Sequence, residues 1–339
     1  MSARPLLATA ALAATGLVLA SCASGSDDAA APADAASDAI VIEHALGETT
    51  IEGTPERVAA IGWGNHDVAL ALGVAPVGVD DQTWSADGSD GLGLYEWSLD
   101  AYADLGADEP VIFDTTDGID FEAIADSAPD VILAAQSGLT EEDYATLTEI
   151  APTVAYPDIP WYTPWRDAAT LDAAALGMAE EGEQLVADVD QQIADATAGS
   201  DFAGKTAAFF YMSAADLSTV SVYAEGDSRT AFLGDLGFDF PEVAVAAGED
   251  GAFYADISAE NADQLDDVDV IVTYGDDTLL DALQSDELWS TVPAVQNGAV
   301  VVVGDGDATS SAVSPSVLSI PWVLNDYVAM LDEAVAASE

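Results

Sequence analysis

The scarcest side chains in this sequence are also the best suited to hold an oxygen-rich ligand. Five Lys and Arg residues stand against 63 Asp and Glu in a chain of 339. Arg166 and Arg229 each fall in the first turn of a predicted helix, where the helix dipole disfavours a cation by about 0.3–1 kcal/mol. Because a guanidinium forms forked hydrogen bonds to oxygen, we predict that both point into a ligand cleft. A local ion pair with Asp167 or Asp227 is the alternative.

Aromatic side chains gather in the loops between the predicted elements. A wall of such rings suits a bulky, partly apolar ligand. The candidates for this wall are Trp63, Trp84, Tyr95, Trp97, Tyr162 and Tyr223. Trp161 and Trp165 flank the same proline-rich turn as Tyr162, and they fit the core of a lobe equally well.

Residues 199–206 match the phosphate-loop pattern G-x-x-x-x-G-K-[ST]. That loop works only when a strand enters it and a helix leaves it, so that backbone amides point at the phosphates. Here a helix is predicted before the segment and a strand after it. We therefore predict no nucleotide site, and we assign Lys205 and Arg57, which each precede a predicted strand, structural roles.

Few side chains are available for metal binding or catalysis. The two histidines are His44 and His66, and we predict a capping or surface role for His66. The acidic segment 114–122 does not keep the spacing of a calcium loop. Neither a G-x-S-x-G motif nor a cysteine other than Cys22 offers a nucleophile. The sequence predicts no cofactor, no metal site and no enzyme, and an exported hydrolase is a minor alternative.

The amino-terminal residues indicate export. The apolar run 6–20 follows Arg4; it has the length of a signal-peptide core and is too short to span a bilayer. Leu-Ala-Ser-Cys at its end resembles the bacterial lipoprotein processing box, which implies removal of residues 1–21 and acylation of Cys22. Residues 22–39 then form a flexible tether. We predict a protein anchored by lipid to the outer face of the cell membrane, without a transmembrane helix.

The large acid excess excludes nucleic acid as a partner, because binding nucleic acid requires a basic face. Solubility in a salty medium is the simplest explanation of the excess. The residues after the tether, with half of the chain hydrophobic, can bury a large core, and their number suggests two lobes.

Short apolar runs alternate with helical patterns in both halves of the chain. The predicted strands are 57–61, 75–79, 131 onward, 206–212, 220–224, the end of the segment 257–274, and 298–304. The predicted helices between and after them include one within 62–73 that stops at Gly73, and 121–127, 229–237 and 321–335. This order predicts an α/β fold with two Rossmann-like lobes, mainly parallel sheets and a ligand cleft between the lobes.

One long helix is predicted over residues 165–198, with Pro164 at its start and Gly199 at its end. Its length would be about 50 Å, and Gly177 inside it would cost about 1 kcal/mol. We expect this helix to join an amino-terminal lobe, 40–164, to a carboxyl-terminal lobe, 199–320. A closing helix is expected over 321–337.

A weak internal repeat supports this division into two lobes. A helix with Glu122 in its first turn is followed by Asp130 and a strand, and Glu260 and Asp269 occupy similar places in the second half.

These features together resemble the solute-binding lipoproteins of bacterial iron-siderophore ABC importers, the two-lobe type with a single long linking helix. The resemblance covers about residues 50–336. The segments on which the resemblance rests include "TPERVAAIGWGNHDVALALGVAPVGV", "TPWRDA", "SRTAFLGDLGF" and "SPSVLSIPWVLNDYV".

The resemblance implies capture of an Fe(III)-siderophore outside the membrane and its delivery to an ABC permease, and we expect a monomer. In such families a glutamate on each lobe docks against arginines of the permease. The matching positions here are Glu122 and Glu260, although a solvated helix face explains both residues as well.

The chain departs from this family in its small number of cations. Pockets for trianionic catecholate complexes gather several arginines, whereas this sequence offers two at most. Neutral or cationic hydroxamate complexes, corrinoids and haem therefore stay open as ligands. A surface lipoprotein without a transport role is the alternative function.

Overall fold

The computed structural model describes residues 39–83, 93–249 and 251–339. Residues 38–339 form one compact unit, which contains two lobes, each built around a five-stranded sheet. The predicted signal peptide, Cys22, the tether up to residue 38 and Trp84 lie outside the described residues. Predictions about these residues stay predictions.

The amino-terminal lobe contains a wholly parallel sheet in the order β5-β4-β3-β6-β7. Its strands are β3 (Val58–Ala60), β4 (Gly78–Asp80), β5 (Val111–Phe113), β6 (Val131–Leu133) and β7 (Thr153–Val154). The following helices are α1 (Asn65–Ala71), α2 (Glu96–Leu105), α3 (Phe121–Asp126), α4 (Glu141–Thr148) and α5 (Trp165–Ala175). Every residue of β3, β4 and β6 is buried, as expected for parallel strands covered on both faces.

An antiparallel hairpin precedes this sheet and was not predicted. It consists of β1 (Ile40–His44) and β2 (Gly47–Ile51). Alternate residues such as Ile42 and Ile51 are buried, which is the period of a strand with one face on a core. The amide of Ala45 bonds the carbonyl of Tyr156 at 3.0 Å, so the hairpin is fixed to the loop after β7.

The carboxyl-terminal lobe contains a mixed sheet in the order β10-β9-β8-β11-β12. Its strands are β8 (Ala207–Ser213), β9 (Asp216–Tyr223), β10 (Tyr254–Ser258), β11 (Val270–Tyr274) and β12 (Val300–Val302). Strand β9 is antiparallel to both β8 and β10, so β10 runs in the direction of β8. The sequence predicted β8, β9, β11 and β12 but neither β10 nor the antiparallel direction of β9.

Short helices cover this second sheet, and a long one closes the chain. The short helices are α7 (Ser228–Leu236), α8 (Glu242–Ala247), the 3₁₀ helices η1 (Ala259–Leu265) and η2 (Trp289–Thr291), α9 (Leu279–Ser285), α10 (Pro293–Asn297) and α11 (Ala308–Ala312). The last helix, α12 (Ser319–Ser338), begins two residues before the predicted start at Pro321. One hydrophobic cluster includes Val68 of α1, Trp165 of α5 and Tyr327 of α12, so the two lobes share a core.

The prediction of a single helix over 165–198 is wrong. Helix α5 ends at Ala175, and a second helix, α6 (Ala179–Thr197), follows it. Gly177 has a φ of 74°, and the amides of Gly177 and Met178 bond the carbonyls of Ala174 and Ala173. This hydrogen-bond pattern is a Schellman cap, which ends a helix at a left-handed glycine. Gly177 is therefore a stop signal and not a helix-interior residue.

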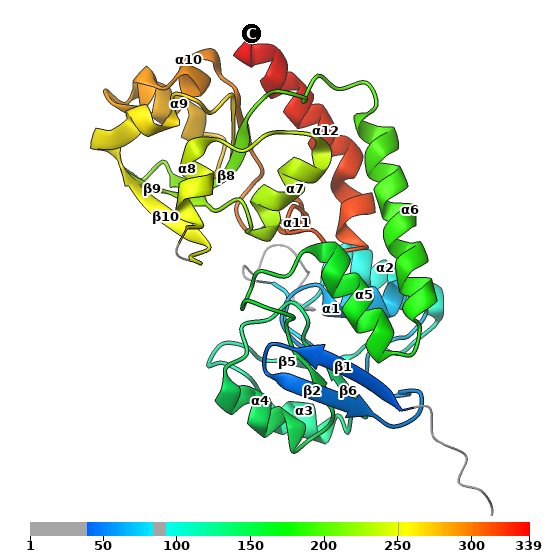
Figure 1. Cartoon of the computed structure of the whole chain (residues 1–339). Coiled ribbons are helices and arrows are strands. Elements are labelled where there is room, and N and C mark those ends of the chain that lie inside the picture. Colours follow the sequence, from blue (N-terminus) through cyan, green and yellow to red (C-terminus); the bar gives the residue numbers. More distant parts are fainter. Residues whose placement is uncertain (1–38, 84–92, 250) are drawn as a thin grey trace, which may run out of the picture. The chain divides into compact units, whose positions relative to one another are not determined.

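Helices α5 and α6 pack against each other after this turn. Gly182 of α6 lies so close to Ala173 of α5 that a β-carbon on the glycine would overlap the alanine side chain. Helix α6 then runs beside α12 (Figure 1). The connection between the lobes is thus α6 alone, braced by a neighbour on either side.

Several smaller predictions can be compared with the structure. Residues 199–206 lie between α6 and β8, the order that speaks against a phosphate loop. The Arg57 side chain donates to the carbonyls of Ser127 and Ala128, and Lys205 lies 3.2 Å from the hydroxyl of Ser338. These contacts agree with structural roles for both cations.

No helix within the described ranges combines the length and the apolar character needed to cross a membrane.

Candidate functional site

A cavity of about 350 Å³ lies where the carboxyl ends of the amino-terminal strands face the second lobe. Trp63 follows β3, the segment Asp81–Thr83 follows β4, and Thr115 follows β5. The strand order reverses direction between β3 and β6, and open α/β sheets bind ligands at such a switch point. The fold thus places loops from three neighbouring strands around one hollow.

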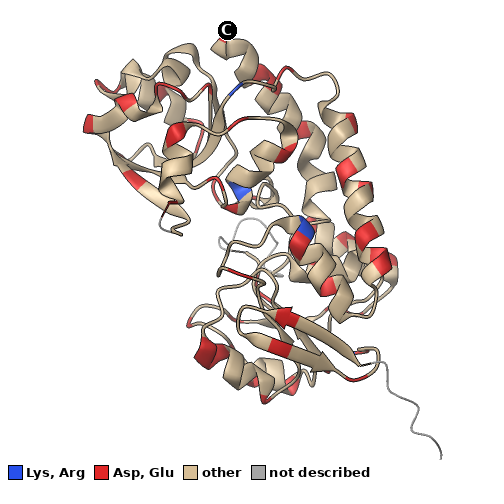
Figure 2. Ribbon diagram, in the orientation of Figure 1, with Lys and Arg blue, Asp and Glu red and all other residues tan. Residues whose placement is uncertain are grey.

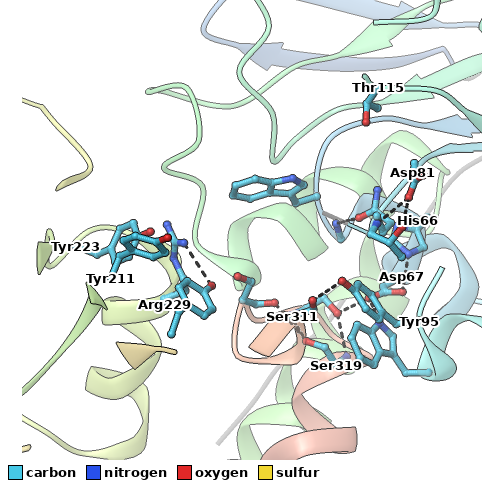
Figure 3. A pocket seen from close by; sticks show the side chains of 18 residues that line it. His66, Asp67, Asp81, Tyr95, Thr115, Tyr211, Tyr223, Arg229, Ser311 and Ser319 are labelled. Carbon is cyan, nitrogen blue, oxygen red and sulfur yellow. Dashed lines mark hydrogen bonds and ion pairs between the residues drawn. The ribbon is translucent and has the colours of Figure 1, made fainter. Parts of the chain in front are cut away.

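The second lobe supplies a wall of tyrosines and one arginine. Tyr211 and Tyr274 are partners on the adjacent strands β8 and β11, and Tyr223 ends β9. The guanidinium carbon of Arg229 lies 3.7 Å from the ring centroid of Tyr223, a cation–π contact. Figure 3 shows Tyr211, Tyr223 and Arg229 on one side of the cavity and His66, Asp67 and Asp81 on the other.

Arg229 is buried and paired with a carboxylate. It is 7% exposed, and Asp227 accepts hydrogen bonds from Nε at 2.8 Å and from Nη2 at 2.7 Å. Burial alone lowers the pKa of Arg229, but the hydrogen bonds and charge of Asp227 outweigh burial, so the pKa rises. The guanidinium therefore stays charged, and Asp227 offsets that charge locally.

A buried carboxylate, Asp67, forms the floor of the cavity on the other side. It is 1% exposed. Its Oδ1 accepts from the Ser98 hydroxyl at 2.7 Å and lies 3.1 Å from His66 Nε2, while Oδ2 accepts from Trp97 Nε1 at 3.1 Å and from the Ser316 hydroxyl. Burial raises the pKa of Asp67, but His66 and the hydrogen bonds lower it more, so the net pKa is below the usual value. Asp67 is therefore ionised.

The prediction of a capping or surface role for His66 is wrong. The side chain is 3% exposed and lines the cavity. Its Nε2 contacts both Ser98 and Asp67, whereas Nδ1 has no hydrogen-bond partner among the described residues. In a serine nucleophile system the serine and the acid bond opposite nitrogens of the imidazole. These three residues therefore do not form a catalytic triad.

Aromatic pairs surround the opening. Trp63 is 48% exposed and contacts Trp161 with ring centroids 4.7 Å apart. Tyr95 and Trp97 stack with centroids 4.9 Å apart, and the Tyr95 hydroxyl bonds the hydroxyl of Ser311. Trp161, which the sequence left between core and cleft, thus extends the aromatic surface through its contact with Trp63.

Five residues predicted for ligand contact line the cavity: Trp63, Tyr95, Trp97, Tyr223 and Arg229. Tyr162 does not appear among the described lining residues; it packs against Gly226 and the second core of the carboxyl-terminal lobe. Its assignment to the ligand wall disagrees with this placement.

The prediction for Arg166 disagrees with the structure in a more informative way. Its guanidinium lies 2.6 Å from Asp190 of α6 and 2.8 Å from Asp235 of α7. It also lies 4.4 Å from the ring centroid of Trp165. Arg166 joins α5, α6 and α7, and it is absent from the described residues that line the cavity. The alternative of an ion pair was right in kind, but Asp167 was the wrong partner.

Sequence reasoning missed several lining residues, and some of them had a detectable signal. Tyr211 and Tyr274 stand at or near the carboxyl ends of two predicted strands, where a ligand site is expected. Ser311 and Ser316 belong to the serine-rich stretch before the closing helix. Asp67 had no such signal, because its partners Trp97, Ser98 and Ser316 come from distant parts of the chain.

The described residues contain no group of three or more His, Cys, Asp or Glu side chains arranged to hold a metal ion.

Comparisons with known proteins agree with this architecture. Residues 58–305 match the family described as periplasmic binding protein. The crystal structure of PiaA from Streptococcus pneumoniae TIGR4 in complex with ferrichrome is 41% identical with a TM-score of 0.83, covering 88% of this chain and 100% of that one. SirA from Staphylococcus aureus, complexed with staphyloferrin B, is 25% identical with a TM-score of 0.69, covering 86% and 98%.

A curated relative from Bacillus subtilis (strain 168), named as the probable siderophore-binding lipoprotein YfiY, is 27% identical over 285 residues, 78% of this chain and 80% of the relative. The family match spans most of the described chain, and the two solved structures share its fold over nearly their whole length. The chain therefore belongs to the periplasmic binding protein family, whose members bind a ligand and do not transform it.

Proposed function

We propose that this chain is the substrate-binding component of an ABC importer and captures an Fe(III)-siderophore. The observation that carries the proposal is the cavity itself, walled by Trp63, Tyr95, Trp97 and Tyr223 with the guanidinium of Arg229 among them. Rings and hydrogen-bond donors recognise the organic wrapping of a metal complex and leave the iron to its chelator. The 41% identity to PiaA, solved with ferrichrome, supports a hydroxamate ligand.

Quenching of tryptophan fluorescence tests this proposal, because Trp63 and Trp97 line the cavity. Titration with ferrichrome should quench the emission saturably, and Trp63→Phe should reduce the amplitude. Trp289→Phe is the matched control, since that indole is buried in the core of the carboxyl-terminal lobe. Haem and a corrinoid complete the panel. If haem or the corrinoid binds and no ferric siderophore quenches the emission, the proposed ligand class is wrong.

Delivery to a permease would use Glu122 and Glu260. Both side chains are exposed; Glu122 lies in the first turn of α3 and Glu260 in the first turn of η1. Helix α3 follows β5, and η1 follows β10, which runs in the direction of β8. Each glutamate therefore lies at the carboxyl edge of its sheet, which supports their use as a matched pair in docking.

The docking proposal predicts a separation of binding from uptake. Glu122→Ala together with Glu260→Ala should abolish iron uptake by cells and leave ferrichrome affinity unchanged. Glu142→Ala with Glu242→Ala is the control, because these exposed acids also occupy first turns, of α4 and α8. Equal uptake by both double variants contradicts the assignment.

Anchoring through Cys22 completes the proposal. Acylation of that cysteine would hold the chain on the outer face of the cell membrane as a monomer near its permease. Cys22→Ser should move the protein from the membrane fraction to the medium or the periplasm. Retention of that variant in the membrane fraction would exclude this anchor.

A further inference from the structure

We propose that Asp227 sets the charge selectivity of the cavity: by neutralising Arg229, it lets the site accept uncharged ferric complexes and reject anionic ones. This inference rests on the proposed function and specifies the substrate class within it. Asp227 acts here as a positioning residue, because it works through Arg229.

Asp227 and Arg229 both lie at the amino-terminal end of α7. Asp227 caps α7, and its Oδ1 accepts the amide of Arg229 at 3.1 Å in addition to Nε. Its Oδ2 accepts from Nη2, which gives a forked carboxylate–guanidinium pair. Asp227 is 3% exposed, so water screens this pair little. Asp227 and Arg229 therefore form a buried pair in this structure.

The pairing leaves Arg229 able to donate hydrogen bonds. A guanidinium has five N–H groups. Asp227 takes one from Nε and one from Nη2, and Nη1 lies 3.4 Å from the hydroxyl of Tyr274. Arg229 also lines the cavity, so its guanidinium can donate to a ligand oxygen there. Arg229 thus offers directional donors whose positive charge is already offset.

The charged groups at the cavity besides Arg229 include two carboxylates and His66, which lies 3.1 Å from one of them, Asp67. Among the described lining residues, the carboxylates Asp67 and Asp81 face this one guanidinium. Asp67 is ionised, as argued above from its partners. Acidic residues are also spread over the helices of both lobes (Figure 2). An anionic complex would be repelled by these carboxylates, and the low local dielectric of the cavity strengthens this repulsion. Such repulsion discriminates against anionic ligands.

The charge on a ferric complex depends on its chelating groups. Three hydroxamates carry one negative charge each and cancel the charge of Fe(III), as in ferrichrome. Polycarboxylate and catecholate chelators leave a net negative complex. The cavity therefore matches the neutral class, and Asp227 is the residue that prevents Arg229 from attracting the anionic class.

Asp227→Asn tests this inference. Asn keeps the size of the side chain and its capping acceptor but removes the charge. We expect the variant to bind ferric staphyloferrin B, an anionic polycarboxylate complex, at least about 10-fold more tightly than the wild type, because the unpaired guanidinium would attract it. Affinity for ferrichrome should rise less than affinity for staphyloferrin B, because a neutral complex gains no charge attraction, so the ratio of the two affinities should fall.

Asp235→Asn is the matched control. It removes the same charge from a carboxylate that pairs with Arg166 away from the described cavity lining. This variant should keep the wild-type ratio of the two affinities. An equal change in both variants would assign the effect to overall charge and overturn the role of Asp227.

Removing one partner of a buried ion pair destabilises a fold, so two further measurements keep the inference falsifiable. Asp227→Ser, a second capping residue, repeats the test if the Asn variant does not fold. The wild type itself should prefer ferrichrome over ferric staphyloferrin B by at least about 100-fold, and equal affinities would overturn the inference. If no ferric complex binds the wild type, the proposed function fails; if ferrichrome binds and the variants keep the wild-type ratio, the role of Asp227 alone fails.

Discussion

The carboxylate of Asp67, in the first turn of α1, accepts a hydrogen bond from the hydroxyl of Ser316, 249 residues further along the chain. This bond ties the amino-terminal lobe to the segment that leads into α12. Ser98 and Trp97 of α2 bond the same carboxylate. One buried charge thus joins three parts of the molecule beneath the cavity.

Ser316→Ala should therefore destabilise the fold. The change removes one hydrogen bond to a buried ionised group, which contributes about 1.5–3 kcal/mol. Urea unfolding measures the loss, with Ser218→Ala, at an exposed position of β9, as the control. Equal stability of the two variants would show that the Asp67 contact contributes nothing.

The two arginines should separate into different phenotypes. Arg229→Met should weaken ferrichrome binding by about 1–3 kcal/mol, because its donors face the ligand space. Arg166→Met should leave that affinity unchanged and lower the free energy of unfolding by about 1 kcal/mol, since its ion pairs are partly exposed to solvent. Calorimetric titration and chemical denaturation of both variants measure these effects. A loss of affinity in the Arg166 variant would restore its predicted place in the cleft.

Asp80 makes stability depend on pH. Burial raises its pKa to about 6, with Asp81 adding to the rise, while the amide bond from Gly62 and the charge of His66 oppose it. The folded state thus binds this proton more tightly than the unfolded state, whose aspartate pKa is 3.8. The protonated Asp80 contributes its full stabilisation below pH 3.8, and this contribution is lost as the pH rises through about 6.

Asp80→Asn removes this titration. The stability of the variant relative to the wild type should increase by up to about 3 kcal/mol between pH 4 and pH 7, the equivalent of a two-unit pKa shift. Denaturation of both proteins across that range checks the sign. A difference that stays constant with pH would contradict it.

Trp161 is held in place by a glycine. The φ of Trp161 is 62°, in the left-handed region. A β-carbon on Gly138 would overlap the indole ring of Trp161. Gly138→Ala should push Trp161 away from Trp63, alter the near-UV circular dichroism of the free protein and weaken ligand binding. Gly199→Ala is the control, because no atom lies within 4 Å of a β-carbon there. Unchanged spectra in the Gly138 variant would refute this support.

The sequence predicted the strands β3, β4, β6, β8, β9, β11 and β12, because buried strands leave local patterns. It missed β5, β7 and β10 and the helix α2. Gly177 shows where local reasoning fails. A glycine in a helical pattern is either an interior cost or a stop, and the packing of Gly182 on Ala173 decides in favour of the stop. The hairpin β1–β2 was missed although each strand buries alternate residues; it directly follows the predicted tether.

The candidate site was predictable only in part for a similar reason. Arg229 finds its partner two residues away, so its setting could be anticipated from "GDSRT". Arg166 finds Asp190 and Asp235, 24 and 69 residues further on. Such pairs exist only after the helices have packed, and no spacing rule in one sequence identifies them.

The cavity depends on contacts between residues far apart in the chain, Tyr95 with Ser311 and Asp67 with Ser316. The cavity therefore exists only when both lobes are folded and in contact. A ligand stabilises only the state that contains its site, so it should slow unfolding while leaving the folding rate of either lobe unaltered. Ligand binding therefore requires both lobes to be folded and in contact with each other.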